Sequence, residues 1–252
     1  MPDILLSFDL SSAEWAIAVI AGILVGIAKT GISGAGMLAI PILAGIFGGK
    51  PSAGLLLPML CIGDVVGVLY YHRHADWHYL RRVLPWALAG ILIGTYVGAV
   101  ISDTYFRIIM GVTIIGGVAI MIWRERCCSE SVIPDHHWIA VFMGLLGGFT
   151  SMIGNAAGPV IALYFLSMRI PKYTYIGTWA WFFLIVNASK VPLHAFVWRT
   201  ITPETLVFDA VLIPAIAVGA FIGVIVVKLI PEKVYRNVII AMTVLAAVKL
   251  FF

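Results

Sequence analysis

The sequence predicts an all-α polytopic membrane protein that contains two inverted repeats of five helical elements each, with short broken helices at the start of each repeat. Hydrophobic residues make up 62% of its 252 residues and charged residues 11%, whereas soluble domains average about 45–50% and about 25%. The apolar runs are continuous, unlike the alternating strands of a membrane β-barrel. Glycines also recur at a spacing of 122 residues, because Gly22, Gly26 and Gly36 are followed by Gly144, Gly148 and Gly158.

Charge and cysteine content narrow the class of protein further. The formal net charge is only +4, which in a membrane protein indicates orientation and not nucleic-acid binding. Cys61, Cys127 and Cys128 lack the spacing of a disulfide framework or of a metal site. The first twelve residues have no basic region, so we expect no cleavable signal peptide. We also expect no cofactor and no bound metal.

The first repeat is assigned to residues 1–130. Ser11-Ser12-Ala13-Glu14 is a capping-box pattern, which predicts a helix that begins there and continues to residue 28. A Gly-rich stretch then interrupts the apolar sequence, and the segment after it, residues 35–47, is shorter than the roughly 20 residues that span a bilayer. Longer spans are expected at 52–71, 83–101 and 104–123, with a polar loop over 72–82.

The second repeat is assigned to residues 131–252, after a polar linker over 124–137. Two short segments, 138–150 and 156–168, flank a second stretch of small and polar residues at 151–158. Longer spans then follow at 173–197, 203–227 and 232–252. The order of elements is therefore the same in both halves.

The distribution of basic residues predicts the orientation. Of the 16 Lys and Arg residues, Lys29 and Lys190 lie inside apolar segments. With five elements per half, ten of the others share one side and four the other, whereas four elements per half would divide them evenly. The positive-inside rule favours the uneven division, which makes the repeats inverted. We expect a multi-pass protein of a bacterial inner membrane with both termini outside the cytoplasm.

Two motifs carry a resemblance to a known family. Gly26-Ile-Ala-Lys-Thr-Gly-Ile-Ser-Gly-Ala-Gly36 and its weaker repeat Gly148-Phe-Thr-Ser-Met-Ile-Gly-Asn-Ala-Ala-Gly158 resemble the TauE/SafE family of sulfite and sulfonate exporters, as do the length and the two-half layout. The resemblance covers almost the whole chain. It implies a secondary transporter, not an enzyme, that exports anions such as sulfite, sulfoacetate or other sulfonates. We expect a proton as the coupling ion, a lipid bilayer as the surroundings and a monomer or homodimer.

The two interrupted stretches are the predicted anion site, because Gly-interrupted short helices at corresponding places in two halves point to a transporter's binding site. A half-helix start supplies free N–H groups and a positive dipole end. Ser33 and Asn155, 122 residues apart, are the expected helix caps and hydrogen-bond donors. The alternative is that the glycines only pack helices. The full predicted substrate-binding set is Lys29, Thr30, Ser33, Gly34, Ala35, Gly36, Ser151, Asn155, Ala156, Ala157, Gly158, Asn187 and Lys190.

Ionisable residues inside apolar segments are functional candidates because burying them is costly. Lys190 corresponds to position 68, one helical turn from Asp64, so both are predicted to face one central cavity. Lys190 would balance the substrate charge and Asp64 would carry the coupling proton; alternatively, Asp64 forms a structural pair with a lysine. His194, Trp179 and Trp181 are predicted to line or gate the pathway, with core packing as the alternative.

Two other classes of protein are weighed against a transporter. A metalloprotein would use a cytoplasmic histidine cluster, but two of these histidines are only two residues apart, which places them on different helix faces. A non-transporting receptor or scaffold explains neither the broken helices nor the buried charges. The histidines of the cluster are His72, His74, His78, His136 and His137.

The Gly90-Gly94-Gly98 series fits either an internal packing face or a dimer seam.

Overall fold

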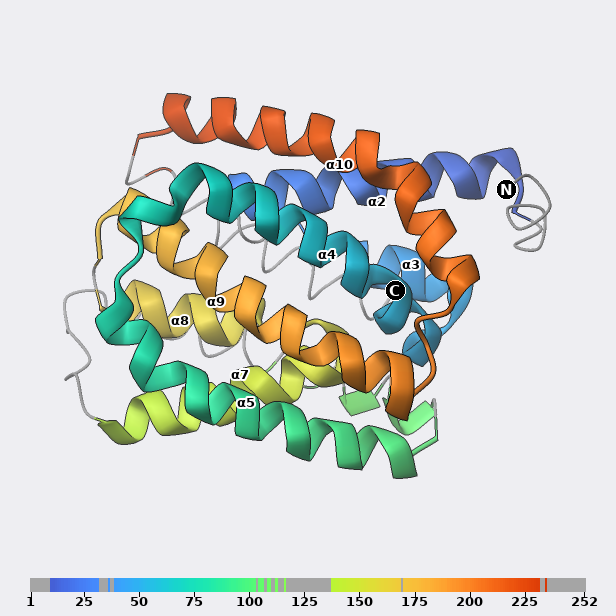
Figure 1. Cartoon of the computed structure of the whole chain (residues 1–252), viewed down its shortest axis with the longest axis horizontal. Coiled ribbons are helices and arrows are strands. Elements are labelled where there is room, and N and C mark those ends of the chain that lie inside the picture. The colour runs from blue at the N-terminus through green and yellow to red at the C-terminus, as the bar shows by residue number, and fades with distance from the viewer. Residues whose placement is uncertain are drawn as a thin grey trace.

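The computed structural model describes residues 10–31, 36, 39–102, 104–106, 108–109, 112, 116, 137–168, 170–231 and 234. These residues are helical and include no strand (Figure 1), and six helices are long and apolar enough to cross a membrane. The prediction of an all-α membrane protein is confirmed. The expected spans at 104–123 and 232–252 lie largely outside the described residues. The six long helices are α2 (Ser12–Thr30), α4 (Gly49–Tyr71), α5 (Trp77–Val100), α7 (His137–Gly154), α9 (Lys172–Pro192) and α10 (Pro203–Leu229).

The first helix of each half is longer than the sequence indicated. The predicted capping box is present at the start of α2, where the Ser11 hydroxyl accepts from the Glu14 N–H. At its end, the helix continues to Thr30, and the Gly31 N–H that follows still donates to the Ile27 carbonyl at 2.8 Å. Likewise α7 continues to Gly154. In the described part of the chain, the short α-helices are α3 (Ala39–Phe47) and α8 (Gly158–Ser167).

The predicted polar loop over residues 72–82 is wrong. After a single 3₁₀ turn, η2 (His72–His74), α5 begins at Trp77. The Asp76 side chain accepts a hydrogen bond of 2.9 Å from the His78 N–H, which caps the helix. The Asp76 N–H donates to the Thr178 hydroxyl at 2.9 Å, which ties the start of α5 to α9.

Glycines bring two pairs of helices into backbone contact. A Cβ on Gly26 of α2 would meet the backbone of Ile216 and Ala220 on α10, so α2 and α10 touch there. A Cβ on Gly148 of α7 would collide with the Ala87 backbone of α5. Gly90 likewise lies against the Leu145 carbonyl, so the Gly90-Gly94-Gly98 series is an internal packing face. Small residues permit this close approach in membrane helices.

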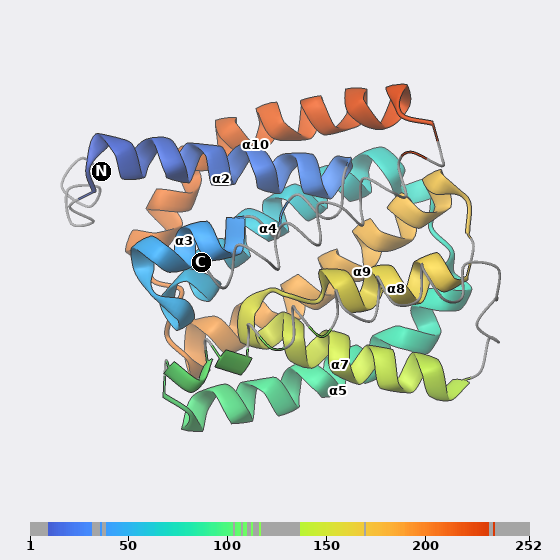
Figure 2. The same cartoon turned by 180° about the vertical axis from the view of Figure 1, so that it is seen from behind.

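The two helix pairs enclose α4 and α9, which pack against each other in the centre (Figure 1). Seen from behind in Figure 2, α2 and α7 begin at opposite ends of the molecule. The short helix α3 lies toward the end at which α2 begins, and α8 lies toward the end at which α7 begins. The division into two inverted repeats stays a prediction, and this opposed arrangement of the two broken hairpins supports it.

Candidate functional site

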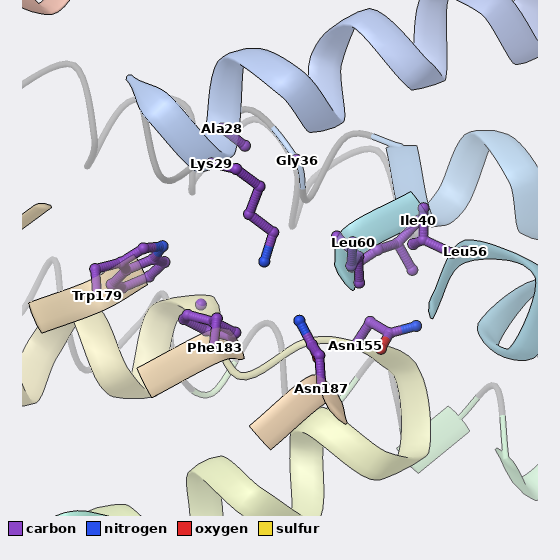
Figure 3. Close-up of a pocket in the computed structure, with 11 residues that line it drawn as sticks. Ala28, Lys29, Gly36, Ile40, Leu56, Leu60, Asn155, Trp179, Phe183 and Asn187 are labelled. Carbon is purple, nitrogen blue, oxygen red and sulfur yellow. The ribbon is translucent and has the colours of Figure 1, made fainter. Parts of the chain in front are cut away.

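A cavity of about 40 Å³ lies between the two interrupted stretches (Figure 3). It receives residues from α2, α3, α4, α9 and the α7–α8 turn, so both halves of the chain contribute. Six of the predicted site residues line it, namely Lys29, Gly36, Asn155, Gly158, Trp179 and Asn187. The other lining residues are Ala28, Ile40, Leu56, Leu60 and Phe183.

Lys29 places a positive charge at this cavity. Its side chain extends from the end of α2 toward Phe183 and Asn187 (Figure 3). The ammonium nitrogen is 2.7 Å from Asp64 Oδ1 and 4.6 Å from the centroid of the Phe183 ring. Lys29 is 6% exposed and Asp64 is fully buried. The ion pair makes burial of the lysine tolerable, and the aromatic face adds a cation–π attraction.

Asp64 links the two halves of the chain. Its second oxygen, Oδ2, accepts a hydrogen bond of 2.6 Å from the Asn187 side-chain amide, which joins α4 to α9. Asp64 does not itself line this cavity, and it contacts Lys29 and Asn187, which do. Its predicted role in coupling stays a prediction. The observed geometry matches the alternative of a pair with a lysine, and the partner is Lys29 of the same half.

Lys190 lies behind the cavity and holds the α7–α8 turn in place. Its ammonium donates to the Ser151 carbonyl and hydroxyl, each at 3.0 Å, and to Asn155 Oδ1 at 2.6 Å. Lys190 is fully buried and does not itself line the cavity. Its predicted role in balancing the substrate charge stays a prediction. Three bonds satisfy all the donors of an ammonium group, so Lys190 acts on the cavity through Asn155.

Asn155 does not cap α8, contrary to the sequence-based prediction. The N-cap is Ala157, which makes no side-chain cap bond. Asn155 instead occupies the left-handed region, with φ of 55°, and its amide donates to the Ala53 carbonyl on α4 at 3.0 Å. Asparagine tolerates that conformation better than most residues. The turn places the start of α8 at Gly158, beside the cavity, with backbone N–H groups that no side chain caps.

The remaining predicted residues lie beside the cavity or away from it. Thr30 donates to the Ala220 carbonyl at 2.7 Å and so fastens the end of α2 to α10. Ala156 and Ala157 are buried in the turn without lining the cavity. Ser33, Gly34 and Ala35 lie outside the described residues.

The predicted gating residues separate into two groups. Trp179 lines the cavity and packs on Phe183 at a centroid distance of 4.6 Å. Trp181 lies against Trp77 instead, at 5.2 Å. His194 is buried in η3 (Leu193–Val197), away from the cavity, with Nδ1 2.8 Å from the Thr200 hydroxyl.

Comparison with known proteins identifies the family. The family described as Sulfite exporter TauE/SafE matches residues 18–250. The chain belongs to the TauE/SafE family. The TauE/SafE family is a family of membrane transporters. No solved structure matches the chain.

One curated relative of this TauE/SafE chain is the "Probable membrane transporter protein MamO" of Paramagnetospirillum magneticum (strain ATCC 700264 / AMB-1). It is 22% identical, over 69% of this chain and 34% of the relative. The chain thus spans about a third of the length of that relative.

Sequence reasoning missed the apolar side of the TauE/SafE cavity. Phe183 lies one helical turn after Trp179, which was predicted, so helical spacing from Trp179 would have found Phe183. Leu60 likewise lies one turn after Leu56. Leu56 and Leu60 carry no such signal, because leucines at this spacing are common in any membrane helix.

The histidines of the rival metal site make separate contacts. His72 Nδ1 lies 3.1 Å from the Leu69 carbonyl, and His78 Nε2 lies 3.4 Å from Arg82. His74 packs on Tyr173, and His137 packs on Trp86. In the described part of the chain, no three His, Cys, Asp or Glu side chains are grouped to hold a metal ion.

Proposed function

We propose that this TauE/SafE transporter exports sulfur-containing anions, such as sulfite, sulfoacetate or other sulfonates, by alternating access around the cavity. The observation that carries the proposal is the convergence of both interrupted stretches on one cavity, with the Lys29 ammonium on one side and the start of α8 on the other. A mid-membrane site between broken helices of two repeats is typical of secondary transporters.

The chemistry of the cavity suits an oxyanion. Such an anion carries several acceptor oxygens and needs donors together with positive potential. The Lys29 ammonium and the amide groups of Asn155 and Asn187 supply side-chain donors. The free N–H groups at the start of α8 and its dipole add about 0.3–2 kcal/mol for an anion. Because Asp64 neutralises part of the lysine charge, the anion would be held weakly enough to leave.

The size of the cavity favours a small substrate. Its volume of about 40 Å³ is a few times the roughly 10–15 Å³ that one ordered water needs. Sulfite has four heavy atoms and needs little rearrangement to fit, whereas a longer sulfonate requires the cavity to widen. Trp179 and Phe183 form the apolar side of the cavity. Water exclusion by these rings strengthens the polar contacts on the other side.

The experiment that tests this function combines binding with transport. Purified protein is screened by thermal shift against sulfite, sulfate, small sulfonates and small carboxylates, since a ligand at 100 times its Kd adds about 2.7 kcal/mol to apparent stability. The best ligand is then followed by labelled counterflow in proteoliposomes. Stabilisation by sulfite or a sulfonate together with its exchange supports the proposal, and the absence of both for every sulfur-containing anion refutes it.

Labelling at two matched positions tests the inverted repeats. Pro51 and Tyr173, 122 residues apart, are both exposed at the start of α4 and α9. In a background without the native cysteines, we expect Pro51→Cys to react with an impermeant reagent from outside and Tyr173→Cys only from the cytoplasm. Reaction of both from the same side would exclude inversion, and with it the placement of both termini outside the cytoplasm.

Lys190→Ala is expected to weaken binding of the best anion at least about tenfold, or about 1.4 kcal/mol. The loss arises because Ser151 and Asn155 lose their shared donor and the α7–α8 turn no longer places Gly158 and Asn155 at the cavity. Lys190→Arg should restore binding only partly, since a planar guanidinium does not reproduce three converging ammonium bonds. Calorimetric titration of each variant checks this, and unchanged affinity in Lys190→Ala would remove Lys190 from the site.

A further inference from the structure

A second buried carboxyl, Asp209 on α10, has no partner. It is 2% exposed, and neither carboxyl oxygen has a hydrogen-bond partner in the described part of the chain. It lies on the face of α10 that also carries Leu212 and Ile216, which are 1% and 0% exposed. Its neighbour Phe208 packs against Trp15 of α2 and Phe47 of α3. Asp209 is therefore an acid inside an apolar helix interface.

The ionisable groups on the packed elements do not offset this burial. The long helices packed against α10 are α2 and α4. Of their charged groups, Lys29 is paired with Asp64, Glu14 is bound by Ser11, and Lys50 lies over the Trp198 ring. The buried tyrosine of α4, Tyr71, packs on Tyr70 and Tyr173 instead. The Cys61 thiol of α4 interacts electrostatically with Asp209, and a thiol carries no positive charge. No described cation forms an ion pair with Asp209.

The protonation state follows from the cost of burial. An isolated carboxylate in a low-dielectric interior costs far more than a neutral carboxyl, which loses only the solvation of polar groups. The neutral acid is thus the form that this arrangement accommodates. Asp64, by contrast, has the Lys29 ammonium and the Asn187 amide beside it, so its burial is offset by a cation and a hydrogen-bond donor.

We propose that Asp209 is the proton-binding site to which anion movement is coupled; this inference rests on the proposed function. Asp209 takes up one proton from one aqueous side and releases it to the other side once in each transport cycle. Water reaches the carboxyl when α10 separates from α4, and the ionised form then becomes stable. The site takes a proton and not a metal cation, because Asp209 belongs to no group of three His, Cys, Asp or Glu side chains in the described part of the chain.

The structure supplies a mechanical link from this site to the anion cavity. Thr30, at the end of α2, donates to the Ala220 carbonyl of α10, 11 residues beyond Asp209. Gly26 and Gly219 keep the two backbones in contact over the same stretch. A movement of α10 therefore carries the end of α2, and with it Lys29. Coupling requires that the two ligands favour different states of one moving element, and in this proposal the fastened α2–α10 pair is that element.

The first test is spectroscopic and needs no transport. Infrared difference spectra of purified protein, recorded between neutral and strongly alkaline pH, should contain the C=O band of a protonated carboxyl. We expect Asp209→Asn to lose that band and Asp209→Glu to shift it. Glu204→Gln, which removes an exposed acid from the first turn of the same helix, is the matched control and should leave the band unchanged. A band that persists in Asp209→Asn would overturn the proposal.

The second test separates coupling from anion transport. In proteoliposomes, wild type and Glu204→Gln should accumulate the labelled anion when a pH gradient of one polarity is imposed. Asp209→Asn should lose this accumulation and retain counterflow at equal pH on both sides. Gradient-driven accumulation by Asp209→Asn would refute the proton site, even though the transporter itself works. Failure of wild type to exchange any anion would refute the proposed function instead. If Asp209→Asn does not fold, the shifted band of Asp209→Glu decides the matter.

Discussion

Asp64→Leu is expected to destabilise the protein by about 3–5 kcal/mol, the usual cost of removing one partner from a buried ion pair. The substitution leaves the Lys29 ammonium without its counter-ion and the Asn187 amide without its acceptor. Both groups are buried, so solvent does not replace the lost contacts. Thermal melts of the purified variant, compared with wild type, measure the effect.

The double variant Lys29→Met/Asp64→Leu should recover most of that stability without recovering anion binding. Two apolar side chains of similar volume replace the pair, and such replacements are often neutral or stabilising. The positive charge at the cavity is then absent, so the best anion should bind at least about tenfold more weakly. A double variant as unstable as Asp64→Leu would show that the pairing is not the origin of the stability. A stable double variant with wild-type affinity would exclude Lys29 as the charge that holds the anion.

The ion pair also shows how far the sequence predicts this site. The offset of 122 residues located both interrupted stretches, because small and polar residues inside apolar runs leave a clear signal. It also placed Asp64 and Lys190 on corresponding helix faces. It did not identify their partners, because a lysine side chain is long enough to reach several neighbouring helices. Lys29 and Ser151 are themselves 122 residues apart, and each meets the charged residue of the next long helix in its own half.

Helix ends were predicted less well than helix positions. The end of α2 depends on the bond from the Gly31 N–H to the Ile27 carbonyl, and the start of α5 depends on the Asp76 cap. Both are single hydrogen bonds within a polar stretch that also fits a loop. The cap of α8 could not be predicted either, because Lys190 of α9 holds Asn155 in a left-handed turn. That contact joins residues 35 positions apart, beyond what local sequence preference can indicate.

Gly36→Val and Gly158→Val are expected to abolish anion binding while the protein stays folded. Both glycines line the cavity. A Cβ on Gly36 would lie 2.9 Å from the Cβ of Ala28, which also lines it, so the larger valine side chain must displace the cavity wall or enter the cavity. In a cavity of about 40 Å³, a valine side chain takes up space that the oxyanion needs. We expect affinity to fall by far more than the roughly 0.5–1.5 kcal/mol of one lost hydrogen bond.

Two further glycines provide the controls for this prediction. Gly45 lies on α3, and a Cβ there would meet no atom within 4 Å, so Gly45→Val should fold and bind like wild type. Gly148→Val should fail to fold, because its Cβ would overlap the Ala87 backbone and force α5 and α7 apart. Elution volume and a cooperative melt establish folding, and calorimetric titration of the best anion establishes binding. If Gly36→Val and Gly158→Val fold and bind like Gly45→Val, the anion site lies elsewhere. If they instead fail to fold like Gly148→Val, helix packing explains both glycines and the anion is held without them.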